Sequence, residues 1–257
     1  MKIDAEKIIE VVKTIKPLFN NHEKAGHITA KGEQDFVTEV DTAVQKMINE
    51  KLKGLYPDIQ MFGEEKDNSE VDFEGDVWIL DPVDGTTNLI HDFRFSALSL
   101  GYSEGGDLCF GVVYQPYTDE LFYAQKGKGA FLNGSRIQVS EAKTIHDSLI
   151  SFGTNPYLRG ELSDRDFESI NNIFRECVDV RRLGSAALDL CYVACGRTEG
   201  FFERRLKPWD FAAGTVIVTE AGGEVVDYEG RAVDHRNASQ VVATNGRVTE
   251  ELLSYLK

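Results

Sequence analysis

The chain has 257 residues, of which 42% are hydrophobic and 28% charged, with 23 glycines and 6 prolines. This length and composition fit one large globular domain or two small packed halves, and they exclude a low-complexity chain. The formal net charge of −15 disfavours nucleic acid as the main partner, because phosphate backbones are bound by clustered Lys and Arg.

Targeting and redox signals are absent from the sequence. The N-terminal segment MKIDAEKIIEVVKTIK is charged from its start and lacks the apolar core of a signal peptide. No run approaches the roughly 20 apolar residues of a membrane span. None of the 4 cysteines forms a C-x-x-C pair, which indicates reduced thiols. We therefore expect a cytoplasmic protein without membrane contact.

The first half of the chain predicts two helices followed by strands. Apolar residues at helical spacing predict helices over 4–24 and 41–55. Short apolar runs at 59–62 and 77–80 fit buried strands. The pattern then predicts an antiparallel meander, with a further turn at Asn133-Gly134 and strands at 97–102, 108–114 and 121–125.

The second half alternates strands with helices. Its predicted strands are 149–152, 178–181, 200–203, 223–226 and 241–243, and its predicted helices are 164–175, 186–195, 210–221 and 248–256. We expect an α+β half over 1–145 and an α/β half over 146–257, packed as one structural unit. The interface between such halves is a usual place for a site.

Four stretches place an acid at the end of an apolar strand or the start of a helix, where a carboxylate can point into a cleft. They are Asp35 to Asp41 (DFVTEVD), Gly63-Glu64-Glu65, Asp81 to Thr86 (DPVDGT) and Pro208-Trp209-Asp210.

The stretch from Asp81 to Thr86 carries the clearest chemistry. An Asp-Pro or Asp-Gly pair also forms turns for local reasons alone. Here, however, Asp81, the Val83 carbonyl and Asp84 can face one point, and Gly85 lets the backbone approach a ligand. Thr86 then starts a helix whose free N–H groups suit a phosphate. Because all these ligands are oxygens, they favour Mg²⁺ or Mn²⁺ over zinc.

Two other acidic motifs share features with this stretch. An EF-hand loop does not fit, because Val83 and Gly85 fall where ligands belong. The haloacid-dehalogenase phosphatases carry D-x-D-G-T, but here the first Asp precedes the second by three residues. Residues i and i+3 of a regular strand face opposite sides, which would misdirect a nucleophilic aspartate. That aspartyl-phosphate mechanism is the less favoured alternative.

The motifs W-I-L-D-P-V-D-G-T-T-N, the upstream G-E-E and the downstream P-W-D-F-A-A-G-T-V-I-V-T-E-A-G-G resemble those of the inositol monophosphatase family. The resemblance extends from about Asp35 to Gly223. It implies a layered αβαβα sandwich of the sugar-phosphatase type with the site between the two halves. It also implies a Mg²⁺-dependent, lithium-sensitive phosphomonoesterase that forms a homodimer.

The resemblance assigns metal ligands in this sequence. Glu64, Asp81 and the Val83 carbonyl correspond to the ligands of a first Mg²⁺, and Asp81, Asp84 and Asp210 to those of a second. A third, loosely held ion near Glu64 belongs to the same pattern. Two such ions about 3.5–4 Å apart clamp the attacking and leaving oxygens of an in-line displacement. We expect Thr38 and Glu65 to lie behind these ligands and to support them.

The resemblance also assigns residues for water and substrate. Asp41 and Thr86 correspond to the pair that orients and deprotonates the attacking water, with Glu64 as a further catalytic residue. The N–H groups of Gly85 and Thr86 correspond to phosphate donors. The remaining substrate-binding positions are Gly184, Ser185, Ala186, Glu203 and Asp210.

The function predicted from the sequence is hydrolysis of inositol 1-phosphate by metal-activated water. Other substrates of the family stay open, namely fructose 1,6-bisphosphate, histidinol phosphate, NADP and 3′-phosphoadenosine nucleotides. A regulatory protein that binds transcription machinery is an alternative of another class. Asp210 also fits a helix N-cap and Glu203 a solvated strand end. The roles of Lys31, His91, Arg204 and Arg205 stay open.

Overall fold

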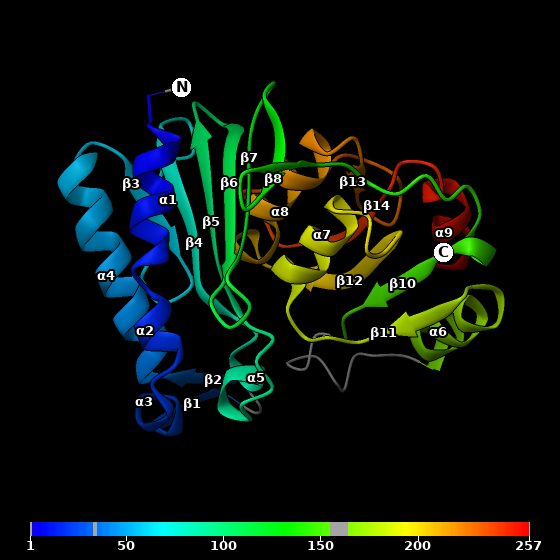
Figure 1. The fold of residues 1–257 in the computed structure, drawn as a ribbon, viewed down its shortest axis with the longest axis horizontal. Coiled ribbons are helices and arrows are strands. Elements are labelled where there is room, and N and C mark those ends of the chain that lie inside the picture. The colour runs from blue at the N-terminus through cyan, green and yellow to red at the C-terminus, as the bar shows by residue number, and fades with distance from the viewer. Residues whose placement is uncertain (1, 33–34, 155–163, 257) are drawn as a thin grey trace.

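The computed structural model describes residues 2–32, 35–154 and 164–256. The chain forms five layers that alternate helices, sheet, helices, sheet and helices (Figure 1). This arrangement confirms the αβαβα sandwich that the sequence predicts. The two sheets lie on either side of a shared middle layer of helices, so groups from both sheets can meet at the ends of these helices.

The first sheet has seven strands in the order β3-β4-β5-β6-β7-β8-β9. Only its first pair, β3 with β4, is parallel, and the antiparallel remainder confirms the predicted meander. Its strands are β3 (Gln60–Gly63), β4 (Asp76–Asp84), β5 (Ala97–Glu104), β6 (Asp107–Gln115), β7 (Glu120–Gln125), β8 (Gly129–Leu132) and β9 (Ser135–Ile137). Helices α1 (Ala5–Lys13), α2 (Lys16–Phe19) and α4 (Glu39–Leu55) cover its outer face.

The second sheet has five strands in the order β11-β10-β12-β14-β13. They are β10 (Leu149–Phe152), β11 (Asp179–Arg181), β12 (Gly200–Leu206), β13 (Glu224–Val226) and β14 (Ser239–Thr244). The middle layer consists of α7 (Ala186–Ala194) and α8 (Pro208–Glu220), and the outer layer of α6 (Asp164–Glu176) and α9 (Thr249–Leu256). The predicted alternation is thereby confirmed, whereas a division of the chain near residue 145 stays a prediction.

Smaller elements complete the chain. A hairpin of β1 (Ile28–Gly32) and β2 (Asp35–Thr38) precedes α4, and α5 (Thr86–Ile90) follows β4 directly. The remaining elements are α3 (His22–Gly26) and the 3-10 turn Ile145–Asp147.

The single helix expected over 4–24 is wrong, because three short helices occupy this segment. Helix α1 ends at Lys13, and its C-cap residue Thr14 donates from its hydroxyl to the Val11 carbonyl at 2.7 Å. Pro17 lies in the first turn of α2, where a proline is tolerated because the first N–H groups of a helix have no partner. Asn21 then caps α3 by accepting from the Lys24 N–H at 3.0 Å. The apolar periodicity predicts the helical conformation of this segment, but it does not reveal these local interruptions.

Small residues let α8 lie directly on the first sheet. A Cβ atom added at Gly111 on β6 would stand 2.3 Å from the Ala213 carbonyl oxygen of α8. At Gly101 on β5, an added Cβ would stand 3.3 Å from the Ala212 Cβ. Helix α8 carries apolar side chains on all sides, as expected for a helix that is buried between two sheets. This close contact fixes where the first turn of α8 meets the ends of the strands.

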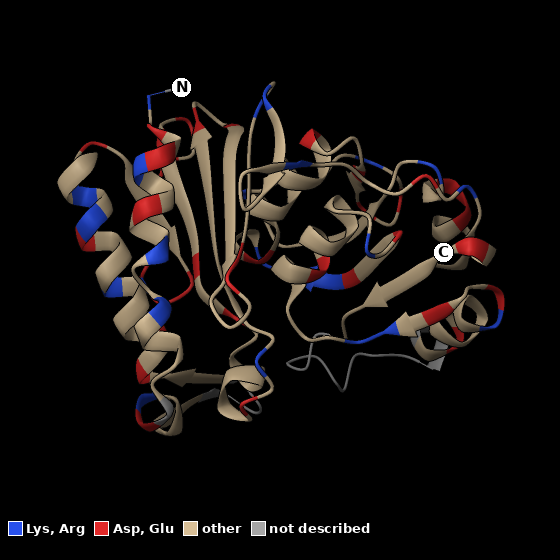
Figure 2. Cartoon of the chain, in the orientation of Figure 1, with Lys and Arg blue, Asp and Glu red and all other residues tan. Residues whose placement is uncertain are grey.

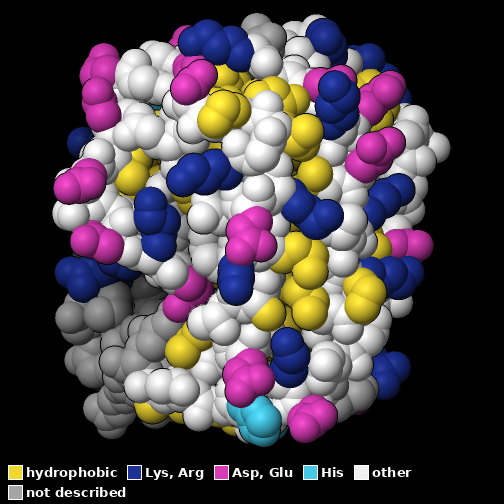
Figure 3. All heavy atoms as spheres, turned by 90° about the vertical axis from the view of Figure 1, so that its left-hand side faces the viewer, with side chains coloured by type: hydrophobic (Ala, Val, Ile, Leu, Met, Phe, Trp, Pro, Cys, Tyr) yellow, Lys and Arg dark blue, Asp and Glu magenta, His cyan; other side chains and the backbone are white. Residues whose placement is uncertain are grey.

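The charged side chains lie mainly outside these layers. Acidic and basic residues follow the outer helices, whereas the strands of the first sheet are largely uncharged (Figure 2). On the face over α1 and α4, the two signs are interspersed and basic residues do not gather in one patch (Figure 3). Among the described residues, no helix is both long and apolar enough to cross a membrane.

The contact between β6 and α8 generates a stability prediction. Gly111→Ala should lower the free energy of unfolding by about 3 kcal/mol, because the added methyl group meets backbone rather than a movable side chain. Gly54→Ala is the matched control, since an added Cβ there meets nothing within 4 Å. Urea unfolding followed by circular dichroism measures both. Equal stability of the two variants would contradict the proposed close contact.

Candidate active site

A bulge in β4 brings Asp81 and Asp84 to the same side of the strand. Asp81 lies opposite Ser99 of β5, and Asp84 lies opposite Ala97. Two steps along β5 thus match three along β4, so one extra residue is inserted at Pro82-Val83. With this insertion Asp84 takes the position that i+2 has in a regular strand. The expectation that residues i and i+3 face apart does not hold here for that reason.

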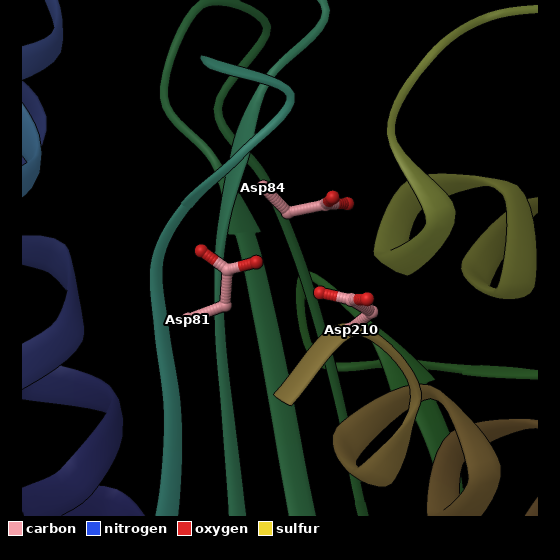
Figure 4. A group of neighbouring side chains, drawn as sticks. All are labelled: Asp81, Asp84 and Asp210. Carbon is pink, nitrogen blue, oxygen red and sulfur yellow. The ribbon is translucent and has the colours of Figure 1, made fainter. Parts of the chain in front are cut away.

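Asp210 reaches these two acids from the first turn of α8. The Ser99 hydroxyl, next to Asp81 in the sheet, donates to the Trp209 carbonyl at 3.0 Å and so holds the start of α8 at the strand. The Lys207 N–H donates to the Asp210 carboxylate at 2.7 Å. Carboxylate oxygens of Asp81, Asp84 and Asp210 lie within 4.8 Å of one another and point toward a common centre (Figure 4).

Glu64 lies beside this cluster because β3 and β4 run parallel. Their register pairs Gly63 with Leu80, and the Glu64 N–H donates to the Leu80 carbonyl at 3.1 Å. The residues that follow these partners, Glu64 and Asp81, are therefore neighbours at the same end of the sheet. Glu64 is half-buried, and its charge is one of the causes that raise the pKa of Asp81.

The carboxylates of the cluster repel one another. Burial is the largest cause that raises the pKa of Asp81 well above its ordinary value, and the charges of Glu64 and Asp84 add to it. Burial, followed by the charges of Asp84 and Glu64, raises the pKa of Asp210 in the same way. A bound cation would offset this repulsion. The all-oxygen donor set fits a hard ion such as Mg²⁺.

The N-terminus of α7 holds Asp84. Its carboxylate accepts from the Ser185 hydroxyl at 2.5 Å and from the Ala187 N–H at 2.7 Å. Ser185 also caps α7, since its oxygen accepts from the Leu188 N–H at 3.4 Å. These bonds lower the pKa of Asp84, but burial outweighs them and raises it to about 6. Ser185 thus contacts an acid of the cluster, and its expected substrate role stays a prediction.

Asp41 and Thr86 are in contact, as the sequence suggested. Asp41 lies in the first turn of α4, where one of its oxygens accepts from the Thr38 N–H at 2.8 Å and from the Thr38 hydroxyl at 2.5 Å. Its other oxygen lies 3.0 Å from the Thr86 hydroxyl. That hydroxyl is also 3.0 Å from the Val83 carbonyl oxygen. Burial raises the pKa of Asp41, against the effect of these hydrogen bonds.

Two glycine loops from the two halves touch at the site. Gly85 has a φ of 90°, and a Cβ there would stand 3.0 Å from the Phe95 carbonyl oxygen and 3.1 Å from that of Gly184. The buried Asn88 amide ties the same loops, donating to the Phe95 carbonyl at 2.7 Å and the Leu183 carbonyl at 2.8 Å. The predicted phosphate loop therefore adjoins Gly184. Asn88, which is 9% exposed, bridges the two loops.

Glu203 approaches the site from the second sheet. It lies on β12, and its carboxylate passes so close to Gly153 that a Cβ added there would stand 1.9 Å from Oε2. Its charge contributes to the raised pKa of Asp210, which places it near the cluster. Glu203 is 9% exposed, so a solvated strand-end position does not describe it.

The other residues whose roles the sequence left open differ in their surroundings. Arg204 stacks over the Tyr228 ring, with its guanidinium carbon 4.9 Å from the centroid. His91 is exposed at the end of α5. Arg205 is exposed and has a φ of 55°. The Lys31 side chain lies outside the described residues.

Sequence reasoning missed two polar residues at the site. Asn88 is the last residue of the motif W-I-L-D-P-V-D-G-T-T-N, but the sequence assigned it no role. Asp189 is 1% exposed on α7, near Glu203 and Asp84. Its signal was a single acid within the otherwise apolar run AALDLCYVA.

The sequence matches the model of the inositol monophosphatase family over residues 1–257. It is 40% identical to the Nus factor SuhB of Escherichia coli (strain K12) over 227 residues, which are 88% of this chain and 84% of that protein. It is 37% identical to the inositol-1-monophosphatase of Rhizobium meliloti over 225 residues, with the same coverage of 88% and 84%. The crystal structure of the suhB protein from Bartonella henselae superposes with a TM-score of 0.91 at 34% identity, covering 98% of this chain and 97% of that one.

The raised pKa of Asp84 generates a prediction for the metal-free protein. Because its folded pKa of about 6 exceeds the ordinary 3.8, the folded state binds more protons than the unfolded state in this window. The stability contributed by this group is full below 3.8 and is lost as the pH rises through 6. Asp84→Asn carries no charge, so its stability relative to wild type should grow by about 2 kcal/mol from pH 4.5 to 7.5.

Thermal unfolding in chelator measures this difference at each pH. Added Mg²⁺ should raise the unfolding temperature of the wild type at pH 7.5 and that of Asp84→Asn much less. A stability difference that does not change with pH would contradict the assignment of the raised pKa.

Proposed function

The chain belongs to the inositol monophosphatase family, and we propose that it hydrolyses a small phosphate monoester, with inositol 1-phosphate as the preferred substrate class and Mg²⁺ as the metal. The observation that carries this proposal is the convergence of Asp81, Asp84 and Asp210 on one point beside the Asp41–Thr86 pair. Polyol and sugar phosphates fit the same site.

The acids would hold the metal ions. Glu64, Asp81 and the Val83 carbonyl are proposed for one Mg²⁺, and Asp81, Asp84 and Asp210 for another, with Mn²⁺ as a substitute and a third ion near Glu64. When bound, such ions neutralise charge on the phosphoryl oxygens and lower the pKa of bound water. The mutual repulsion of the acids supports this role, since a cation relieves it.

Asp41 and Thr86 would handle the proton of the attacking water. The Thr86 hydroxyl lies between the Asp41 carboxylate and the Val83 carbonyl, 3.0 Å from each. When it donates to one of these oxygens, its lone pairs can accept from a water molecule, and Asp41 is the base to which the proton passes. Two hydrogen bonds from Thr38 fix the Asp41 carboxylate in this position. Burial raises its pKa, which makes it a better proton acceptor.

The substrate would bind between the two glycine loops. The N–H groups of Gly85 and Thr86 begin α5 and are proposed as phosphate donors, because the first N–H groups of a helix have no partner within it. Helix α5 has only one turn, so these local donors matter more than a helix dipole. Glu203 would accept hydrogen bonds from substrate hydroxyls, next to the segment Gly184, Ser185 and Ala186, and Asp210 would contribute to the same pocket.

The alternatives now differ in weight. Membership in this family removes the basis for a haloacid-dehalogenase mechanism with a phosphorylated Asp81. Fructose 1,6-bisphosphate, histidinol phosphate, NADP and 3′-phosphoadenosine nucleotides stay as other substrates of the proposed activity. A homodimer and a cytoplasmic location stay predictions.

A role in transcription is a second candidate function. It is favoured by the 40% identity to proteins named Nus factor SuhB. The acids of the site are all present here, so such a role would add to catalysis rather than replace it. Co-purification of transcription proteins with the tagged chain, with and without substrate, tests this function separately from hydrolysis.

The proposed activity predicts phosphate release. Purified protein should release phosphate from inositol 1-phosphate with Mg²⁺ and should lose this activity in chelator. Asp84→Asn and Asp210→Asn should each lower kcat at least about a hundredfold while leaving the fold intact. Asp58→Asn, an exposed acid away from the site, is the control and should keep full activity. No release from this or any related monoester would refute the proposal.

The contact between Gly153 and Glu203 predicts an effect on substrate binding. Gly153→Ala should displace the Glu203 carboxylate and raise KM for inositol 1-phosphate about tenfold, because a charge-assisted hydrogen bond is lost. KM for p-nitrophenyl phosphate, which has no hydroxyl groups, should change little. Gly54→Ala serves again as the control. Equal effects on both substrates would show that Glu203 does not bind substrate hydroxyls.

A further inference from the structure

The loop that follows β3 folds back onto the free edge of the first sheet. Strand β3 is the terminal strand of this sheet, so one side of its backbone has no neighbouring strand among the described residues. The loop over 64–75 connects β3 to β4 and begins with Glu64, an acid of the site. Unpaired N–H and C=O groups at such an edge need other partners. Side chains of the loop supply several of them.

Asn68 pairs with both backbone groups of Gly63, the last residue of β3. The Gly63 N–H donates to Asn68 Oδ1 at 3.0 Å, and Asn68 Nδ2 donates to the Gly63 carbonyl at 2.8 Å. An opposite residue in an antiparallel strand makes the same pair of hydrogen bonds. Because Gly63 is buried, leaving these groups without partners would be costly. We refer to this pair of bonds as the Asn68 clamp.

The Asn68 clamp acts on the peptide group that leads into Glu64. The carbonyl of this peptide belongs to Gly63 and accepts from Asn68. Its N–H belongs to Glu64 and donates to the Leu80 carbonyl at 3.1 Å. The two bonds hold the peptide from opposite sides of β3, so a rotation of the peptide would break both. The placement of Glu64 beside Asp81, which follows Leu80, therefore depends on both bonds.

Helix α4 encloses the same residue from a third direction. A Cβ atom added at Gly63 would stand 2.9 Å from Oε1 and 3.0 Å from Nε2 of Gln45. The Gln45 side chain is 8% exposed, so it has little space into which to move. Gly63 thus lies between Gln45, β4 and the Asn68 clamp. The end of β3 is held more tightly than an ordinary strand end at the edge of a sheet.

A second clamp of the same kind lies at the other end of β3. Gln60 Nε2 donates to the Asp72 carbonyl at 2.8 Å, and the Asp72 N–H donates to Gln60 Oε1 at 2.9 Å. Gln60 is the first residue of β3, at the opposite end of the strand from Glu64. Both clamps fasten the loop to the strand, but only the Asn68 clamp acts on a peptide next to an acid of the site. The two clamps therefore separate a role in stability from a role at the site.

We propose that Asn68 is a positioning residue for Mg²⁺, which holds the Gly63–Glu64 peptide so that the Glu64 carboxylate reaches the place proposed for the first ion. Asn68 itself contributes no ligand. Groups behind the ligands of a metal commonly change its affinity by about tenfold to a hundredfold. This inference rests on the proposed function and deepens it, because it names a residue that sets the affinity of the proposed metal position.

Mg²⁺ binding to the protein without substrate tests the inference by isothermal titration calorimetry. The binding step to be compared is the one that Glu64→Gln weakens. Asn68→Ala should raise its Kd about tenfold, because the peptide before Glu64 loses one of its two bonds. Gln60→Ala is the matched control and should leave this Kd within about twofold of the wild type. An unchanged Kd in Asn68→Ala, or an equal increase in both variants, would overturn the inference.

Hydrogen exchange of the wild type, followed by NMR, keeps the test decisive if Asn68→Ala does not fold. Coupling between two events is reciprocal, so bound Mg²⁺ should stabilise the Asn68 clamp by the same factor by which the clamp favours Mg²⁺. Saturating Mg²⁺ should therefore slow exchange of the Gly63 N–H about tenfold and that of the Asp72 N–H less than about twofold. No slowing at Gly63, or equal slowing at both amides, would overturn the inference.

The wild type separates the inference from the proposed function. If it binds no Mg²⁺ and releases no phosphate from inositol 1-phosphate, the proposed function fails and the inference fails with it. If it does both, and Asn68→Ala binds Mg²⁺ as tightly as the wild type, only the role of Asn68 is refuted.

Discussion

The site depends on holding mutually repelling acids close together at one point. The charge of Asp84 helps to raise the pKa of both Asp81 and Asp210, and burial raises the pKa of all three acids. Without a cation this arrangement lowers the stability of the fold, so it persists only where the surroundings fix it. The bulge in β4 places Asp81 and Asp84 on one side, the N-terminus of α7 holds Asp84, and the bond from Ser99 to the Trp209 carbonyl holds the helix start that carries Asp210. Packing elsewhere offsets the unfavourable free energy of gathering these acids, and the close contact of α8 with the glycines of the first sheet is part of that packing.

The same arrangement resolves a contradiction between charge and substrate. A chain with a net charge of −15 would repel a phosphate ester, and the cluster itself is acidic. In the proposed function, cations held by the acids would reverse the sign of the local field, and backbone N–H groups at Gly85 and Thr86 would add donors without a basic side chain. The acidic composition is therefore compatible with an anionic substrate, provided that metal binds first.

Local signals in the sequence predicted most elements and the acids of the site, because strand ends and helix starts are marked by nearby residues. These local signals could not predict the features of the site that depend on the register between paired strands. Parallel pairing of Gly63 with Leu80 makes Glu64 a neighbour of Asp81, and an inserted residue turns Asp84 to the same side. Neither follows from periodicity within one segment. Asp189 on α7 was missed for a related reason, since Ser151 and Glu203, which influence its pKa, lie on the separate strands β10 and β12. The helix over 4–24 failed locally, through Thr14, Pro17 and Asn21.

The two sheets divide the work of the site. In the proposed function, the acids of the first sheet, with Asp41 behind them, would serve the phosphoryl group, whereas Glu203 on the second sheet would face the remainder of the substrate. Directly after Glu203, the pairing of β12 with β14 shifts register before Leu206, and Arg205 there has a φ of 55°. Because the strand is irregular next to Glu203, substitutions there can be accommodated without disturbing the cluster on the other sheet. Family membership therefore supports a phosphatase, whereas the proposed substrate depends on the residues of the second sheet.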